Sequence, residues 1–116
     1  PNVFGIYLLY RVLQDMPEIQ HIDQKTKARM RKLEDTIANT ASMRMLIQNP
    51  EARSSTVMAV SGKEEFIAQV KKEAEKAGMQ LGGGYGPLKP TSFRIANFPA
   101  ITDAEFDKLI AFLKKY

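Results

Sequence analysis

The chain has 116 residues, of which 44% are hydrophobic and 26% charged, and it contains no cysteine, no tryptophan and one histidine, His21. This composition is typical of one globular domain with one hydrophobic core, and it excludes disulfides, thiolate metal sites, cysteine nucleophiles and sites that need two imidazoles. The net charge of +4 allows anionic partners. The longest apolar run, Ile6–Tyr10, is too short to span a membrane, and no signal-sequence pattern is present.

Two helices are predicted first. The segment Gly5–Asp15 has apolar residues at helical spacing and on nearly all of its faces. We therefore expect it to be buried, either in this chain or against a part of the protein outside it. A second helix is predicted from Pro17 to about Asn39. Its start is placed at Pro17 because proline is common in the first turn of a helix. Its apolar stripe consists of Ile19, Ile22, Thr26, Met30, Leu33 and Ile37.

The second helix also carries a cluster of basic residues. No exposed aromatic residues lie between them, so the cluster is interpreted as a solvated helix face and not as a nucleic-acid surface. We expect no nucleic-acid partner. The cluster consists of Lys25, Lys27, Arg29, Arg31 and Lys32.

A strand is predicted from Met43 to Gln48 and a second over Ser55–Val60, with a turn at Asn49-Pro50-Glu51 that Arg53 braces. The methionines of these strands, Met43, Met45 and Met58, are interpreted as core packing. The sequence Ser61-Gly62-Lys63-Glu64 has the pattern of a capping box, which opens a helix that ends at Gly78.

The last third is predicted to hold a short strand at Met79–Leu81, a glycine-rich stretch at Gly82–Pro87 and a strand over Ser92–Asn97. A second capping box, Thr102-Asp103-Ala104-Glu105, opens a final helix that runs to Lys114 and Lys115. The order of elements predicts an α+β fold, in which helices cover a small, antiparallel, four-stranded sheet.

The glycine-rich stretch, with Tyr85, Lys89 and Arg94, is the main candidate site. Glycines allow a backbone to approach a ligand, and successive free amides can hold an anion. The spacing matches neither a phosphate-binding loop nor a dinucleotide fingerprint, and a plain connection between strands is the alternative.

Arg94 lies within a predicted strand, directly beyond the glycines. A guanidinium fork in that place suits bidentate binding of a carboxylate or phosphate. The alternatives are a structural salt bridge and an outward-facing, solvated arginine. His21 is expected at a surface or interface, and no nucleophile–base pair or metal-ligand spacing is found.

The residues from Gly82 to Ile95 resemble the late signature of class V pyridoxal-phosphate aminotransferases, in which a glycine-rich loop leads into a strand that carries Phe-Arg-Ile. Asn97-Phe98-Pro99-Ala100 continues as in phosphoserine aminotransferase-like members. Asn49–Ser54 resembles a turn in the last domain of the family. Pro1-Asn2 resembles the junction between the large cofactor domain and that last domain. The resemblance spans the chain and covers the C-terminal third of a full enzyme.

This resemblance implies that residues 1–116 are a single C-terminal domain of a fold-type I enzyme, with residues 1–16 as a helix linking it to the absent large domain. Arg94 matches the arginine that binds the substrate α-carboxylate. Tyr85 and Lys89, with the backbone of Gly84 and Gly86, are further candidate substrate contacts. The lysine that holds pyridoxal phosphate belongs to the large domain, so no catalytic, cofactor-binding or metal-binding residue is assigned to this chain.

The whole enzyme is expected to transfer an amino group between an amino acid and a 2-oxo acid, as a cytoplasmic homodimer active in serine biosynthesis. Phosphoserine aminotransferases typically carry a His-Arg pair in this loop, where this sequence has Gly-Tyr-Gly-Pro-Leu-Lys. That difference leaves open the serine–pyruvate or alanine–glyoxylate branch of the same class. A free-standing α+β domain that binds a small anion is the other alternative.

Overall fold

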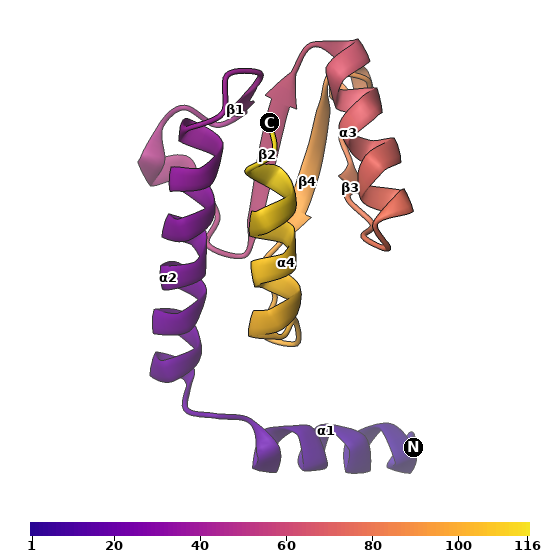
Figure 1. Ribbon diagram of the computed structural model, residues 1–116. Coiled ribbons are helices and arrows are strands. Elements are labelled where there is room, and N and C mark those ends of the chain that lie inside the picture. The colour runs from indigo at the N-terminus through magenta and orange to yellow at the C-terminus, as the bar shows by residue number, and fades with distance from the viewer.

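The computed structural model describes all residues from 1 to 116. Its helices and strands follow the predicted order (Figure 1). They are α1 (Val3–Asp15), α2 (Ile19–Ala38), β1 (Met43–Met45), β2 (Val57–Gly62), α3 (Glu64–Lys76), β3 (Gly82–Gly83), β4 (Ser92–Ala96) and α4 (Asp103–Leu113). The four strands form one antiparallel sheet in the order β1-β2-β4-β3. The predicted α+β fold is therefore confirmed.

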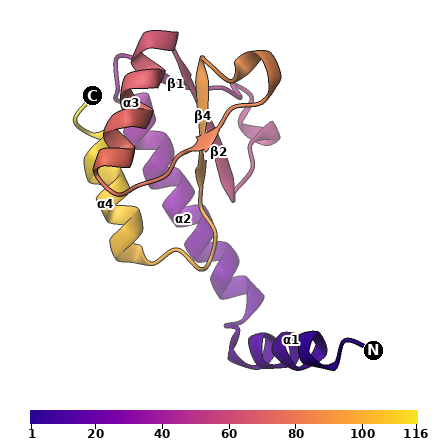
Figure 2. The ribbon, with the colours of Figure 1, turned by 90° about the vertical axis from the view of Figure 1, so that its right-hand side faces the viewer.

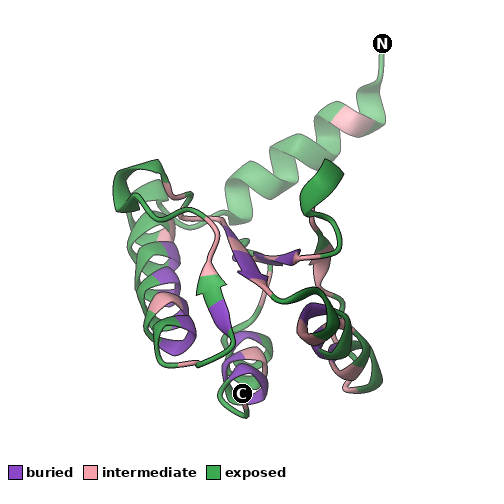
Figure 3. Ribbon diagram, turned by 90° about the horizontal axis from the view of Figure 1, so that it is seen from above, coloured by how far each residue is buried: buried purple, intermediate pink, exposed green.

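Three helices cover one face of this sheet. Figure 2 shows α2, α3 and α4 on that face, and the segments near Pro50–Ala52 and Gly86–Leu88 on the other side. Seen from above, the buried parts of the three helices are turned toward the strands (Figure 3). The molecule thus has a helical layer, a sheet, and a second sheet face that carries loops with two short 3-10 helices, Pro50–Ala52 and Gly86–Leu88.

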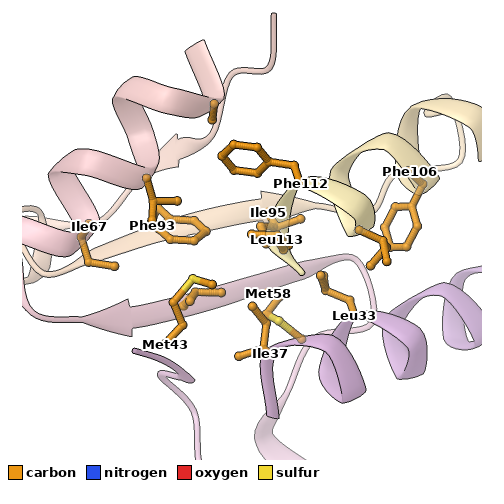
Figure 4. Close-up of a cluster of buried hydrophobic side chains, with 14 of the residues drawn as sticks. Leu33, Ile37, Met43, Met58, Ile67, Phe93, Ile95, Phe106, Phe112 and Leu113 are labelled. Carbon is orange, nitrogen blue, oxygen red and sulfur yellow. The ribbon is translucent and has the colours of Figure 1, made fainter. Parts of the chain in front are cut away.

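The hydrophobic core fills the space between helices and sheet (Figure 4). Strands β2 and β4 place Met58 opposite Ile95 and Val60 opposite Phe93, and all four side chains are buried. The helices contribute Leu33, Ile37, Ile67, Val70, Phe106, Ile110 and Leu113 to the same core. Because side chains alternate along a strand, the residues between these core positions point to the loop-bearing face.

Helix α1 takes no part in the core. None of its residues is buried, and Figure 1 shows it extending away from the rest of the chain beyond the bend at Met16–Glu18. Of the two expected places of burial, the one within this chain is therefore excluded, and the predicted helical conformation is confirmed. Most of its large apolar side chains are at least half exposed, including Phe4 at 72%.

Several predicted boundaries differ from the structure. Helix α2 begins at Ile19 with Glu18 as its N-cap, so Pro17 precedes the helix. Strand β1 ends at Met45, because the carbonyls of Ile47 and Gln48 accept hydrogen bonds from the Arg53 side chain in the following turn.

Of the two predicted capping boxes, only the second is present. Thr102 accepts a hydrogen bond from the Glu105 amide, and the Glu105 carboxylate accepts one from the Thr102 amide. The first pattern fails because Ser61 and Gly62 complete β2, which leaves Lys63 as an N-cap without a side-chain bond.

The strand predicted at Met79–Leu81 is also wrong. Met79 and Leu81 pack against the core without strand pairing, and the short strand β3 is formed by Gly82 and Gly83. A glycine at position 78 with φ of 74° ends the preceding turn, as predicted.

The interpretation of the basic cluster as a solvated face is wrong for Arg29, whose side chain is only 8% exposed. Its Nε donates to Asp103 at 2.9 Å, its Nη1 donates to the Ile101 carbonyl at 2.8 Å, and the guanidinium lies over the Phe106 ring. These contacts fasten α2 to the start of α4. The hydrogen bond from Arg29, with that from Lys25, lowers the pKa of Asp103.

We predict that Asp103→Asn lowers the melting temperature of the protein at neutral pH, because it leaves the buried Arg29 without a charged partner. Since folding lowers the pKa of Asp103, its contribution is fully present above the unfolded pKa of about 3.9 and is lost as the pH falls through the folded pKa. Thermal unfolding of both proteins across this range checks the prediction. The exposed partner of Lys32, Asp107, offers the control Asp107→Asn, and equal losses in the two variants would contradict it.

Candidate functional site

Arg94 lies in the middle of β4, between the core residues Phe93 and Ile95. It is paired with Ala59 of β2 on the sheet face opposite the helices. Its position on that face follows from the sequence, since burying Phe93 and Ile95 on one side turns Arg94 to the other. The side chain is half-buried.

The glycine-rich segment holds the Arg94 guanidinium. Gly82 pairs with Arg94 across β3 and β4, which brings the following residues over the arginine. Arg94 donates from Nε to the Gly83 carbonyl at 2.7 Å and from Nη1 to the Tyr85 hydroxyl at 2.8 Å. The guanidinium also lies 4.2 Å from the centroid of the Tyr85 ring. Of the predicted candidate site, the glycine-rich segment, Tyr85 and Arg94 therefore lie together.

Arg94 has no acidic partner. The chain contains five ion pairs, and none of them includes Arg94. Its two hydrogen bonds leave Nη2 and one Nη1 hydrogen without a protein acceptor. A structural salt bridge within this chain is thus excluded, and the contacts with Tyr85 and Gly83 distinguish the side chain from a freely solvated arginine. The remaining donors form the planar fork that matches a carboxylate or a phosphate.

A pocket of about 360 Å³ opens beside Arg94 and Tyr85. Seven of its eleven lining residues are hydrophobic, and besides Arg94 its only charged residues are Glu34 and Arg53. Arg53 donates to the carbonyls of Ile47 and Gln48, each at 2.9 Å, and pairs with Glu34 at 3.2 Å. The predicted bracing role of Arg53 is confirmed. The sequence did not indicate Glu34, which lies 19 residues earlier, on α2.

The glycines of the loop have steric functions. A Cβ at Gly84 would lie 2.2 Å from the Ser92 Oγ and 2.7 Å from the Leu88 carbonyl oxygen. Gly86 has a φ of 49°, which disfavours other residues. The amides of Leu88 and Lys89 donate to carbonyls of Tyr85 and Gly86, so these donors are used inside the loop.

Two other candidate residues lie apart from Arg94. Lys89 is exposed and does not line the pocket beside Arg94. It borders a different hollow with Lys71 and Glu75, and its carbonyl accepts a hydrogen bond from Lys71. His21 is exposed in the first turn of α2.

No group of three or more His, Cys, Asp or Glu side chains is arranged to hold a metal ion. None of the helices combines the length and the apolar character that a membrane span requires.

The fold is similar to parts of solved aminotransferases. A phosphoserine aminotransferase from Cytophaga hutchinsonii matches 99% of this chain at 30% identity with a TM-score of 0.88. A phosphoserine aminotransferase from Bacillus circulans subsp. alkalophilus matches 99% at 21% identity, with a TM-score of 0.75. An alanine–glyoxylate aminotransferase from Nostoc sp. matches 79% at 18% identity, with a TM-score of 0.67.

The chain spans about a third of the two phosphoserine aminotransferases, 32% of each, and 25% of the Nostoc enzyme. No protein-family model and no curated protein sequence matches it. The predicted resemblance to class V aminotransferases is confirmed: two phosphoserine aminotransferases match nearly the whole chain, and an alanine–glyoxylate aminotransferase matches 79% of it.

We predict that Gly84→Ala destabilises the protein by about 1–3 kcal/mol, as overpacking does, because the added methyl group meets backbone and side-chain atoms that cannot all move away. Gly83→Ala is the matched control, since nothing lies within 4 Å of a Cβ there. Chemical denaturation of both variants measures the difference. Equal stabilities would show that the loop does not pack against β4 as described.

Proposed function

We propose that this chain is the C-terminal domain of a pyridoxal-phosphate-dependent aminotransferase that resembles phosphoserine aminotransferases. The whole enzyme transfers an amino group between an amino acid and a 2-oxo acid. This domain supplies Arg94, which binds the substrate carboxylate. The similarity of the chain to aminotransferase domains, at 30% identity to one phosphoserine aminotransferase, supports this proposal.

The observation that carries the proposal is the state of Arg94. No negative side chain of this domain offsets the charge of the half-buried Arg94 guanidinium. The Gly83 carbonyl and the Tyr85 side chain fix its orientation. Binding a carboxylate there neutralises the charge and uses the free Nη donors. Because the arginine is oriented beforehand, little freedom is lost on binding. Such an arginine orients the substrate so that its α-carbon meets the reacting groups.

The cofactor of such enzymes, pyridoxal 5'-phosphate, acts as an electron sink for the substrate's α-carbon. We propose that its binding site lies outside this chain. No lysine lines the pocket beside Arg94, and all lysines are exposed except Lys71, which is half-buried and donates to the Lys89 carbonyl. We therefore assign the cofactor and its lysine to the remainder of the enzyme.

Helix α1 supports the domain assignment. Its exposed side chains Phe4, Leu9 and Leu13 are between 56% and 72% accessible. A helix that is apolar nearly all round is stable in water only when other parts of the protein cover it. We assign this role to the large domain of the enzyme, with α1 (in residues 1–16) as the link between the domains.

As an enzyme of this kind it is expected to be a cytoplasmic homodimer, and to serve serine biosynthesis if phosphoserine is its substrate.

We predict that Arg94→Ala in the full-length enzyme raises the KM for amino acids and 2-oxo acids by about 10- to 100-fold. This range corresponds to about 1.5–3 kcal/mol, the value of hydrogen bonds to a charged group. Arg94→Lys keeps the positive charge but loses the two-pronged guanidinium, so its KM should lie between those of the unmodified enzyme and Arg94→Ala. Steady-state kinetics checks this, and an unchanged KM in Arg94→Ala would contradict the role of Arg94.

The domain assignment predicts that the isolated chain of residues 1–116 self-associates through α1. A variant with Phe4→Glu and Leu9→Glu should stay monomeric at concentrations where the unmodified chain associates, with the same circular dichroism spectrum. Light scattering measures the difference. A monomeric unmodified chain would instead favour a free-standing domain.

A further inference from the structure

Tyr85 contacts the Arg94 guanidinium in two ways, although the tyrosine is largely exposed. Its hydroxyl accepts a hydrogen bond from Nη1 of Arg94 at 2.8 Å, and its ring centroid lies 4.2 Å from the central guanidinium carbon. The residue is 71% exposed, so packing in the core does not account for the position of its ring. The contacts with Arg94 do.

The loop ties the backbone of Tyr85 to the strand that carries Arg94. The Tyr85 carbonyl accepts a hydrogen bond from the Leu88 amide at 3.0 Å, and the Leu88 carbonyl accepts one from the Ser92 hydroxyl at 2.6 Å. Ser92 begins β4 and is buried. Because these bonds do not involve the guanidinium, the loop can place the tyrosine ring where Arg94 rests against it.

The contacts with Gly83 and Tyr85 also determine which edge of the guanidinium stays free. A carboxylate can bind an arginine in bidentate fashion across Nε and one terminal nitrogen, or across both terminal nitrogens. Nε of Arg94 has a single hydrogen, which it donates to the Gly83 carbonyl at 2.7 Å. The edge formed by Nη1 and Nη2 is therefore the one left for a carboxylate.

We propose that Tyr85 is a positioning residue for Arg94. Its ring sets the plane of the guanidinium and its hydroxyl sets the rotation within that plane, so that Nη1 and Nη2 together face the substrate carboxylate. This inference rests on the proposed function of Arg94 and extends it to the residue that aims the guanidinium. A side chain that is oriented beforehand loses less freedom on binding, so loss of Tyr85 weakens substrate binding even though Arg94 remains.

The test compares tyrosine variants of the full-length enzyme by steady-state kinetics, with whichever of L-phosphoserine and L-alanine the unmodified enzyme uses better. Tyr85→Phe keeps the ring and loses the hydroxyl, so its KM should rise about 2- to 10-fold, as for the loss of one hydrogen bond. Tyr85→Leu loses both contacts, and its KM should rise further. The kcat should change little, since the carboxylate is held alike in the ground state and the transition state.

Tyr116→Phe is the matched control. It removes a tyrosine hydroxyl that donates to Glu73, and its ring packs against Phe66 and Phe112 on the helical side of the sheet. Its KM should equal that of the unmodified enzyme. Melting temperatures establish that the variants are folded.

A second comparison separates positioning from direct contact with the substrate. In an Arg94→Ala enzyme, Tyr85→Phe should raise the KM no further, because the guanidinium that Tyr85 positions is absent. The same rise in both backgrounds would mean that Tyr85 contacts the substrate itself, and it would overturn the inference. An unchanged KM in folded Tyr85→Leu would overturn it as well.

These failures differ from a failure of the proposed function. If the tyrosine variants behave unexpectedly but Arg94→Ala alone raises the KM, the carboxylate-binding role of Arg94 stands without Tyr85. If Arg94→Ala leaves the KM unchanged, the proposed function itself fails, and the positioning role of Tyr85 fails with it.

Discussion

The pairing of β3 with β4 is the constraint on which the candidate site depends. Phe93 and Ile95 must face the helices to complete the core, so Arg94 can only point to the other side of the sheet. The two glycines of β3 then run alongside it and bring the Gly83 carbonyl and Tyr85 to the guanidinium. The core and the candidate site therefore use alternate residues of one strand, and a shift of register by one residue would exchange the two faces.

The same alternation gives the sheet one face that packs against the helices and one face that carries the candidate site. On the helical side, apolar side chains and the Arg29–Asp103 contact fasten α2, α3 and α4 to the sheet. On the other side, loops surround Arg94 and leave a pocket instead of a core. Two features of the chain lack a partner within it: Arg94 has no acidic side chain beside it, and the apolar helix α1 is exposed. Both features have a common explanation if the rest of an aminotransferase covers α1 and closes the site at Arg94.

Local patterns predicted much of this arrangement. The alternation from Phe93 to Asn97 identified the strand and placed Arg94 on the face opposite Phe93 and Ile95. The Thr102–Glu105 capping box marked the start of α4. The similar pattern at Ser61 failed because strand pairing outweighed capping. Contacts between distant segments could not be predicted. The partners of Arg53 and Arg29, Glu34 and Asp103, lie 19 and 74 residues away in the sequence, and only the packing of α2 determines that these charges meet.

The most direct test of the role of Arg94 is a crystal structure of the full-length enzyme with a bound 2-oxo acid. The account predicts that both carboxylate oxygens accept hydrogen bonds from the Arg94 guanidinium at about 2.7–2.9 Å, with the guanidinium still against the Tyr85 ring. A carboxylate bound elsewhere would contradict it, as would an Arg94 already paired with an acidic side chain from the remainder of the protein.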